Sequence, residues 1–212
     1  MRDRPCRLAV LLSGAGSTLV NLQRHVASGE VPAEIAVVVS SRADALGLER
    51  ARELGLEARA LGRRPFRHDG AFDEVAYSRA LAALLEPFAP DLLVLAGFMT
   101  RLAPPVLDRW PALNVHPALL PAFGGEGFYG HRVHEAVLSA GAAVSGATVH
   151  FVSAEYDRGP IVLQEEVAVL PGDDADSLAA RVQDAERRIY PRAVAAFARG
   201  ELGRLCPVRG TK

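Results

Sequence analysis

The fold class is decided by residues 8–18, which read Leu-Ala-Val-Leu-Leu-Ser-Gly-Ala-Gly-Ser-Thr. The apolar residues Leu8–Leu12 predict a short strand that is buried on both faces. The glycines that follow predict a tight turn, and Ser17–Ser28 has the periodicity that is typical of a helix. A buried strand, a glycine turn and a helix in that order indicate a βαβ unit and therefore a parallel sheet.

The same alternation continues through the first half of the chain. Apolar runs predict further strands over Ile35–Ser40, Leu56–Leu61 and Leu92–Ala96. Between these strands, amphipathic segments predict helices over Ala43–Leu54 and Ala71–Phe88. Strands separated by helices of this length predict a mostly parallel, twisted, Rossmann-like α/β sheet with helices on both faces.

In the second half of the chain, the predicted strands and helices no longer alternate regularly. Strands are expected over Leu113–His116, Ala147–Val152 and Ile161–Leu170, and a helix over His131–Ala140. A long final helix is expected from about residue 174 to residue 199, with a kink or an interruption at Pro191. Because no repeat or linker-like stretch breaks the pattern, residues 1–212 are interpreted as a single domain.

Composition excludes several classes of protein. Half of the 212 residues are apolar, 23% are charged and the formal net charge is −1, so a disordered chain or a basic nucleic-acid surface is not expected. No apolar run has a membrane-spanning length, and the N-terminus does not resemble a signal peptide. Cys6 and Cys206 form neither a disulfide framework nor a zinc motif, which favours a cytoplasmic protein. Lys212 is the only lysine, which argues against a Walker-type loop or a pyridoxal Schiff base.

The glycine turn at residues 13–18 can be interpreted in three ways. The amide groups at the start of the next helix, with the hydroxyls of Ser17 and Thr18, suit a phosphate monoester. A purely structural turn with a serine cap is the second interpretation. The third is NADP binding through Ser41 and Arg42, although Leu19 stands where the dinucleotide motif needs glycine.

A second motif is Asn114-Val115-His116-Pro117. Alternate residues of a strand share a face, so Asn114 and His116 are expected to project together while Leu113 and Val115 enter the core. An amide donor beside an imidazole suits a reaction that forms an oxyanion and moves a proton. A structural His-Pro at a strand end is the alternative.

Asp157 and the remaining histidines leave further alternatives open. Asp157 either lies in an exposed turn with Arg158 or raises the pKa of His116 by favouring its charged form. His131 and His134 are interpreted as packing or capping residues, and no metal site is expected. His150 is interpreted as a satisfied, half-buried histidine within a strand.

Taken together, these motifs resemble the phosphoribosylglycinamide formyltransferase family over roughly residues 7–200. The runs that carry the resemblance are Leu12–Leu19 (LSGAGSTL), Ser40–Ala51 (SSRADALGLERA), Leu95–Met99 (LAGFM), Asn114–Pro121 (NVHPALLP), Gly146–Val152 (GATVHFV) and Asp157–Ile161 (DRGPI). The resemblance implies a formyltransferase fold and transfer of a formyl group from 10-formyltetrahydrofolate to the amine of 5′-phosphoribosylglycinamide, in purine (IMP) biosynthesis.

The resemblance also implies a role for individual residues. Asn114, His116 and Asp157 match the catalytic trio, in which Asn114 would donate to the oxyanion and Asp157 would keep His116 charged or hold a relay water. Residues matching the ribonucleotide site are Gly14, Gly16, Ser17, Thr18 and Glu186, the last at the ribose or amine end. Residues matching the folate site are Met99, Thr100, Arg101, Leu102, Asn114, Ser153, Ala154, Glu155 and Tyr156.

The chain departs from the family pattern in four places. Ala15 and Thr18 stand where asparagines are common, and Arg101 is displaced by one position. Residues 62–76 do not align cleanly, which leaves Arg67 as a candidate for the folate glutamate tail. The segment Phe123–His134 is longer than in short family members.

The implied partners are two small molecules, with the formyl-folate as a co-substrate and no permanently bound cofactor. No nucleic acid or membrane is expected, and the protein is expected to be a monomer or a homodimer. A formyltetrahydrofolate hydrolase with the same trio is the closest alternative. An NADP-binding Rossmann module is a more distant one.

Overall fold

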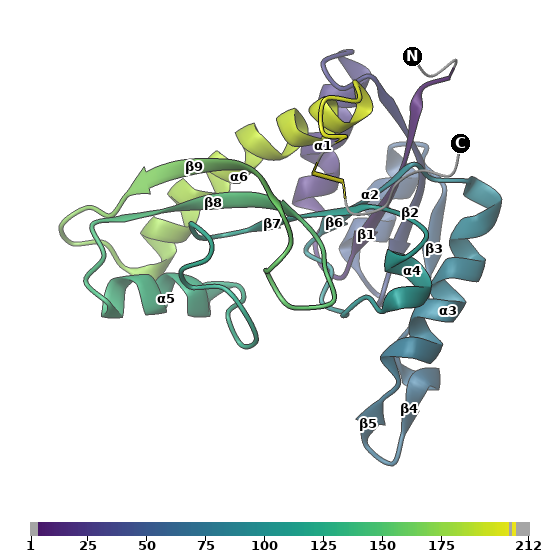
Figure 1. Ribbon diagram of the computed structural model, residues 1–212, viewed down its shortest axis with the longest axis horizontal. Helices are drawn as coiled ribbons and strands as arrows, with labels where there is room; N and C mark the ends of the chain where they lie inside the picture. The colour runs from purple at the N-terminus through teal and green to yellow at the C-terminus, as the bar shows by residue number, and fades with distance from the viewer. Residues whose placement is uncertain (1–3, 204, 207–212) are drawn as a thin grey trace.

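The structure, a computed structural model, describes residues 4–203 and 205–206. Its centre is a seven-stranded sheet with the strand order β3-β2-β1-β6-β7-β8-β9 (Figure 1). The strands are β1 (Cys6–Leu12), β2 (Ala33–Ser40), β3 (Ala58–Ala60), β6 (Leu92–Ala96), β7 (Ala112–His116), β8 (Val144–Phe151) and β9 (Ile161–Ala168). A separate two-stranded hairpin consists of β4 (Arg67–His68) and β5 (Ala71–Phe72).

The first five strands of that order are parallel. β1 pairs with β2 on one side and with β6 on the other, and β3 and β7 extend the two flanks. The runs that predicted β1 and β6 are buried along their whole apolar length, as a sheet covered on both faces requires. The expected α/β class with a mostly parallel sheet is therefore confirmed.

The remaining strands are antiparallel. β8 pairs with β7 so that His150 lies opposite Asn114 and Thr148 lies opposite His116, and β9 pairs with the other edge of β8. Because β7 is the last parallel strand, its C-terminal end borders both halves of the sheet. Asn114 and His116 thus stand where the two pairing modes meet.

Helices cover both faces of the sheet. The helices are α1 (Ser17–Ala27), α2 (Leu46–Glu53), α3 (Glu74–Leu85), α4 (Pro104–Leu107), α5 (His131–Ser139) and α6 (Ala175–Ala198), with short 3-10 turns η1 (Arg64–Phe66) and η2 (Glu86–Phe88). Leu8, Val10 and Leu12 of β1 pack into one core cluster together with residues of α1, α5 and α6. Ala9 and Leu11 pack into the other cluster with α3 and α4, as the alternation of a strand predicts.

Several element boundaries differ from expectation. α2 begins at Leu46 instead of Ala43, because the preceding residues form a turn in which Arg42 pairs with Asp44. The helix expected over residues 71–88 is divided: residues 71–72 form β5, α3 follows an Asp73 cap that accepts from the Ala76 amide at 2.8 Å, and Pro87 lies in η2.

The long C-terminal helix also differs, because α6 continues unbroken through Pro191. The expectation of an interruption there is wrong. Proline removes one hydrogen bond of a helix, and here the carbonyl that loses its partner belongs to Arg187. That carbonyl accepts a hydrogen bond from the side chain of Asn21 in α1 at 2.9 Å, so the helix continues without an unpaired group at this turn. Within the described ranges, no helix has both the length and the apolarity needed to cross a bilayer.

Candidate active site

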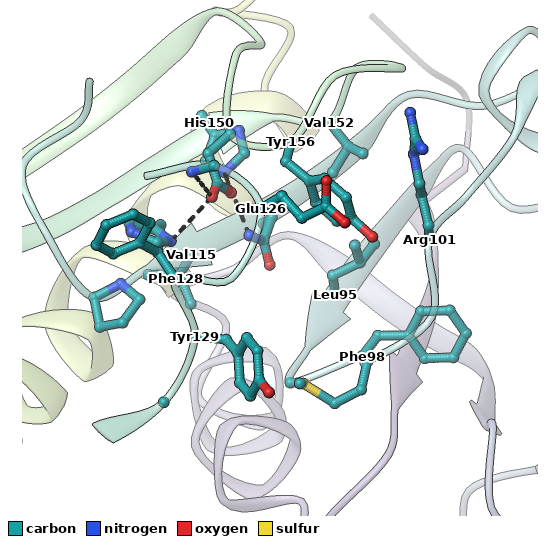
Figure 2. Close-up of a pocket in the computed structure, with 18 of the residues that line it drawn as sticks. Leu95, Phe98, Arg101, Val115, Glu126, Phe128, Tyr129, His150, Val152 and Tyr156 are labelled. Atoms are coloured by element: carbon teal, nitrogen blue, oxygen red, sulfur yellow. Dashed lines mark hydrogen bonds and ion pairs between the residues drawn. The ribbon is translucent and has the colours of Figure 1, made fainter. Parts of the chain in front are cut away.

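A pocket of about 810 Å³ opens beside the C-terminal ends of β6 and β7 (Figure 2). This is the edge at which open parallel α/β sheets place their ligands, and the volume suits a drug-sized molecule. The sequence-predicted residues on its wall are Thr18, Met99, Thr100, Arg101, Leu102, Asn114, His116, Ser153, Glu155, Tyr156, Asp157 and Glu186. Segments that are far apart in the sequence are therefore brought together in one cavity.

The floor of the pocket carries Asn114 and His116 from β7. Both project to the same side of the strand, as expected, and His116 is only 3% exposed. Leu113 enters the core, whereas Val115 is only half-buried and also reaches the pocket wall. The expectation that Val115 lies within the core is therefore only partly met, because the strand ends at the cavity.

His150 is the principal residue that sequence reasoning missed. It was interpreted as half-buried, but it is 2% exposed and lines the pocket opposite Asn114. His150 Nδ1 lies 2.9 Å from the carbonyl oxygen of Phe151, so this nitrogen carries the proton and donates it. The other ring nitrogen, Nε2, lies 3.3 Å from Asn114 Nδ2 and 3.5 Å from Asp157 Oδ1, so it links the amide to the carboxylate. Only the pairing of β7 with β8 could have revealed this contact.

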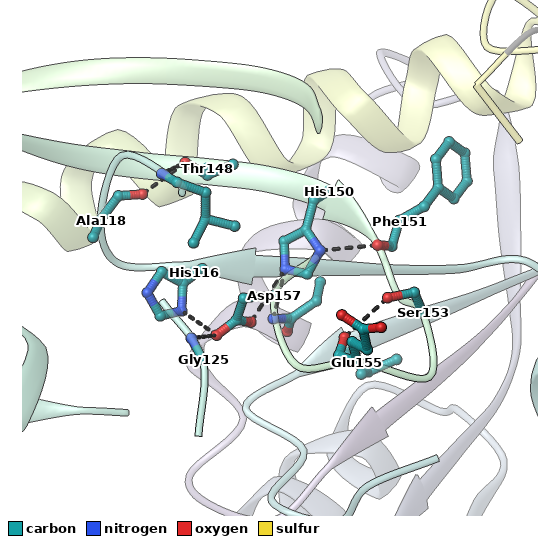
Figure 3. A network of polar contacts seen from close by, with 12 residues as sticks. His116, Ala118, Gly125, Thr148, His150, Phe151, Ser153, Glu155 and Asp157 are labelled. Atoms are coloured by element: carbon teal, nitrogen blue, oxygen red, sulfur yellow. Dashed lines mark hydrogen bonds and ion pairs between the residues drawn. The ribbon is translucent and has the colours of Figure 1, made fainter. Parts of the chain in front are cut away.

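Asp157 completes the cluster and lies between the two imidazoles (Figure 3). Its Oδ2 atom is 3.5 Å from His116 Nδ1, and its Oδ1 atom is 3.5 Å from His150 Nε2. The backbone amide of Gly125 donates to Oδ2 at 2.9 Å. Burial opposes ionisation of Asp157, but the contacts with His150, Gly125 and His116 outweigh it and lower the pKa of the carboxyl. The interpretation of Asp157 as part of an exposed turn is therefore wrong.

The loop that carries Asp157 is held by close backbone packing. Asp157 has a φ of 54°, in the left-handed region that aspartate and asparagine tolerate better than most residues. Two residues later, a Cβ on Gly159 would stand 1.7 Å from the carbonyl oxygen of Phe151. Glycine is therefore required in the Asp-Arg-Gly-Pro motif, because the loop crosses directly over the end of β8.

Burial sets the resting state of His116. Desolvation is the largest influence and lowers the pKa of the imidazole, while Asp157 and the Phe123 carbonyl raise it and offset only part of that effect. His116 Nε2 donates to the Phe123 oxygen at 2.8 Å, which leaves Nδ1 facing the carboxylate. The expectation that Asp157 raises the pKa of His116 is confirmed as one contribution, but burial outweighs it and lowers the pKa overall, so the expectation that Asp157 keeps the imidazole charged is wrong.

The segment after His116 is fixed by side chains of β8 and β9. Thr148 Oγ1 donates to the Ala118 carbonyl at 2.6 Å and accepts from the Leu120 amide at 3.0 Å. Gln164 donates to the Leu120 carbonyl at 3.0 Å and contacts Thr148 Oγ1 at 2.9 Å. These bonds bind the antiparallel strands to the loop that supports the pocket floor, and Figure 3 shows Thr148 beside Ala118.

The glycine turn between β1 and α1 meets the pocket at one point. Thr18 lines the pocket, whereas Ser17 lines a neighbouring hollow, and Gly14 and Gly16 do not reach the pocket wall. Gly16 has a φ of 78°, and a Cβ there would stand 2.7 Å from Gly47 Cα, so this position requires glycine. The first turn of α1 leaves backbone N–H groups without helical partners, as an anion site requires.

The side chains considered for NADP are engaged elsewhere. Ser41 is buried and its hydroxyl lies 2.7 Å from that of Ser13, which also accepts from the Met99 amide at 2.9 Å. Arg42 is paired with Asp44 through two hydrogen bonds. These contacts favour a structural role for the residues after β2.

The mouth of the pocket joins the two segments that were matched to folate. Arg101 donates to the carbonyl of Ala154 at 2.5 Å, and its guanidinium lies 5.1 Å from the centre of the Tyr156 ring (Figure 2). Ala154 therefore contributes through its backbone, and it is absent from the pocket wall. Arg63 lines the pocket, whereas the candidate Arg67 lies in β4 and does not.

One helix contributes a carboxylate and an amide to the pocket lining. Glu186 and Gln183 of α6 are three residues apart and both line the pocket. Burial raises the pKa of Glu186 to about 7, and the charge of Arg187 offsets part of this rise. Gln183 was not predicted, although its i, i+3 spacing from Glu186 could have indicated it.

Comparison with known proteins agrees with this geometry. A family model described as formyl transferase matches residues 6–194. The chain is 39% identical over 92% of its length to the Escherichia coli (strain K12) phosphoribosylglycinamide formyltransferase, of which it covers 88%. It is also 39% identical over 97% of its length to the bovine trifunctional purine biosynthetic protein adenosine-3, and it spans only 20% of that relative.

Solved structures show the same relationship. A glycinamide ribonucleotide transformylase 1 from Symbiobacterium toebii superimposes with a TM-score of 0.85 at 40% identity, covering 94% of this chain and 90% of the other. A phosphoribosylglycinamide formyltransferase from Coxiella burnetii, solved in complex with CHES, gives a TM-score of 0.82 at 32% identity, covering 93% and 89% respectively.

Proposed function

The chain belongs to the formyl transferase family, and we propose that it transfers the formyl group of 10-formyltetrahydrofolate to the amine of 5′-phosphoribosylglycinamide in purine biosynthesis. The formyl-folate acts as a co-substrate. The enzyme is expected to be cytoplasmic, and to act as a monomer or a homodimer. No permanently bound cofactor is required by the steps below.

One observation carries this proposal. The Asn114 amide and the His116–Asp157 pair meet at the floor of a single pocket whose lining carries different recognition groups. Arg101 and Tyr156 come from the loops that follow β6 and β8, and Glu186 comes from α6. This arrangement supports two substrates whose reacting atoms meet over the floor.

Asn114 is suited to stabilise the oxyanion. Attack of the amine nitrogen on the formyl carbon forms the new C–N bond and moves an electron pair onto the formyl oxygen. One N–H of the Asn114 amide is directed to His150, which leaves its second N–H for that oxygen. A preorganised donor of this kind contributes roughly 3–4 kcal/mol to catalysis.

His116 and Asp157 are suited to move the proton. The attacking amine becomes cationic and must lose a proton before the C–N bond to folate N10 breaks. Because burial favours the neutral imidazole at rest, His116 can accept that proton, and the adjacent Asp157 carboxylate stabilises the imidazolium that forms. The proton is then delivered to N10, which leaves as the amine of tetrahydrofolate.

The lining of the pocket suggests how each substrate is held. Met99, Leu102 and Tyr156 offer apolar and aromatic surface for the pterin and benzoyl rings of the folate, and Arg63 or Arg101 can pair with its glutamate carboxylate. The amide groups at the start of α1 with Thr18 suit the phosphate. Glu186 can accept hydrogen bonds from the ribose hydroxyls.

An assay of formyl transfer tests the proposal. Purified protein is supplied with 10-formyltetrahydrofolate, with and without glycinamide ribonucleotide, and tetrahydrofolate and the formylated ribonucleotide are both quantified. We expect equal amounts of the two products, formed only when the ribonucleotide is present. Formation of tetrahydrofolate and formate without the ribonucleotide would instead indicate a hydrolase and overturn the proposal.

A matched pair of variants links this activity to the floor of the pocket. His116→Gln is expected to abolish most turnover, because it removes the proton-transfer group. His25→Gln is the control, since His25 also pairs with a carboxylate, Glu30, at 2.7 Å, but lies in α1 outside the pocket wall. Equal turnover in the two variants would contradict the assigned role of His116.

A further inference from the structure

Pro191 creates an acceptor in the middle of α6. Each helical residue normally donates its N–H to the carbonyl four residues earlier, and proline has no N–H to donate. The carbonyl left without this partner is that of Arg187. Asn21 of α1 supplies the missing donor, with Nδ2 at 2.9 Å from the Arg187 oxygen.

This hydrogen bond connects the two helices that border the proposed ribonucleotide site. Asn21 lies three residues after Thr18, on the same side of α1, and Arg187 directly follows Glu186. Thr18 and Glu186 both line the pocket. Figure 1 shows α1 beside the C-terminal part of α6, and Ser17, Asn21 and Arg187 border a hollow of about 540 Å³ between helices.

From this arrangement we infer that Asn21 is a positioning residue for the ribonucleotide, which acts through its hydrogen bond to the Arg187 carbonyl. The inference rests on the proposed function, because it concerns the same site. The ribonucleotide is held at its phosphate by the start of α1 and at its ribose by Glu186. A ligand that is bound at both ends binds well only when the distance between the two sets of binding residues matches its length.

The directional bond between Asn21 and Arg187 sets that separation. Elsewhere the two helices meet through the apolar cluster that contains Leu19 and Leu22 of α1 and Val182 and Ile189 of α6. Apolar contacts are not directional and permit small shifts of one helix along the other. A hydrogen bond depends on both distance and angle, so it fixes the position of one helix along the other.

A substitution of similar shape tests the inference. Asn21→Leu keeps the branching and the number of heavy atoms in the side chain and removes the donor. We expect the KM for the ribonucleotide to rise about fivefold, which corresponds to about 1 kcal/mol, while kcat and the KM for the formyl-folate change less than about twofold. Gln23→Leu, which removes another amide from α1 without touching Arg187, is the control and should leave all three parameters unchanged.

A second variant, Pro191→Ala, distinguishes two roles of Asn21: holding α6 in position, and only supplying a hydrogen bond to the Arg187 carbonyl. In Pro191→Ala, the new backbone N–H can bond to the Arg187 oxygen within α6, so the carbonyl no longer needs Asn21. The loss of melting temperature caused by Asn21→Leu should then shrink. The rise in ribonucleotide KM should persist, because the Arg187 oxygen has a second lone pair that still accepts from Asn21 and holds α6 to α1.

Three results would overturn the inference: an unchanged ribonucleotide KM in Asn21→Leu, an equal rise for both substrates, or a rise that disappears in the Pro191→Ala background. Wild-type turnover with glycinamide ribonucleotide tests the proposed function separately. If that turnover is absent, crystal structures of wild type and Asn21→Leu still decide the matter. An unchanged distance from Thr18 to Glu186 would then refute the positioning role.

Discussion

At the floor of the pocket, polar side chains are buried and bonded to one another, whereas at its mouth large apolar side chains stand in solvent. His116 and His150 are 3% and 2% exposed, while Met99 and Tyr156 are 54% and 44% exposed. Buried polar groups with fixed partners need little reorganisation when charge develops in a reaction. Exposed apolar groups gain free energy only when a ligand covers them. The residues of the floor should therefore govern kcat, and the residues of the mouth should govern KM.

The largest effect on kcat is expected at Asn114, on the floor of the pocket. If its amide stabilises the oxyanion, Asn114→Ala should lower kcat by roughly a hundredfold to a thousandfold. The KM for formyl-folate should change less than about tenfold, because the interaction strengthens only in the transition state. Steady-state kinetics and melting temperature are measured together. An unstable but active variant would show that Asn114 only satisfies buried groups.

Asp157 provides the next largest effect. Asp157→Asn removes the charge but keeps the shape and the tolerance for a φ of 54°, so the loop should stay in place. We expect kcat to fall roughly a hundredfold, within the range for loss of general acid–base catalysis, with little change in melting temperature. Asp44→Asn, at an exposed ion pair, is the control. Near-normal turnover of Asp157→Asn would remove this residue from the proton-transfer step.

Glu186 lines the pocket from α6, and its raised pKa predicts a dependence on pH. Its pKa of about 7 means that the carboxylate, the better acceptor for ribose hydroxyls, forms as pH rises from 6 to 8. The kcat/KM for the ribonucleotide should therefore rise by up to about tenfold over this interval relative to Glu186→Gln. Because the substrate is the same, its own titration cancels in the ratio of the two enzymes. Parallel pH profiles of the two proteins would contradict this assignment.

The same raised pKa has a consequence for stability with a definite sign. The folded protein holds the Glu186 proton more tightly than the unfolded chain, whose pKa is near 4.5. This contribution to stability is fully present below pH 4.5 and is lost as pH rises through about 7. Melting temperature should therefore fall less between pH 5 and 8 in Glu186→Gln than in wild type.

The smallest effect is expected at the mouth. Tyr156→Ala removes a ring that lies under the Arg101 guanidinium, and it should raise the KM for formyl-folate about fivefold, or about 1 kcal/mol, with kcat nearly unchanged. Tyr156→Phe keeps the ring and should behave like wild type. A fall in kcat as large as that of Asp157→Asn would break the division between floor and mouth.

Local pattern was sufficient to predict much of this molecule. The apolar runs of β1 and β6 and the alternation of Asn114 and His116 depend on neighbouring residues alone, so they could be predicted from the sequence. His150 could not be recognised, because its role depends on pairing between strands separated by about thirty residues. The net lowering of the pKa of His116 was also missed, since burial is a property of the assembled fold.

Two predictions about helices were wrong because contacts with other parts of the chain decide the structure there. The segment before α3 forms η1 and the β4–β5 hairpin, which place Phe66 and Phe72 respectively against Tyr77, and a helical pattern does not reveal these contacts. At Pro191 the helix continues where the rule for proline predicts a break, and a donor from α1 bonds to the freed carbonyl. The fold class and the Asn114–His116 pair were therefore easier to predict than the contacts that connect strands and helices.

The register between β7 and β8 also affects how such a chain can change over evolution. Asn114 and His150 face each other because the ladder of backbone bonds aligns them, whatever the length of the connection between the strands. The glycine-rich stretch Phe123–His134 lies within that connection. Residues can be gained or lost there without moving the amide away from its imidazole, as long as Gly125 or a substitute still reaches Asp157. Changes in loop length therefore leave the catalytic residues in place. Substrate preference can change at the mouth of the pocket while the reaction stays the same.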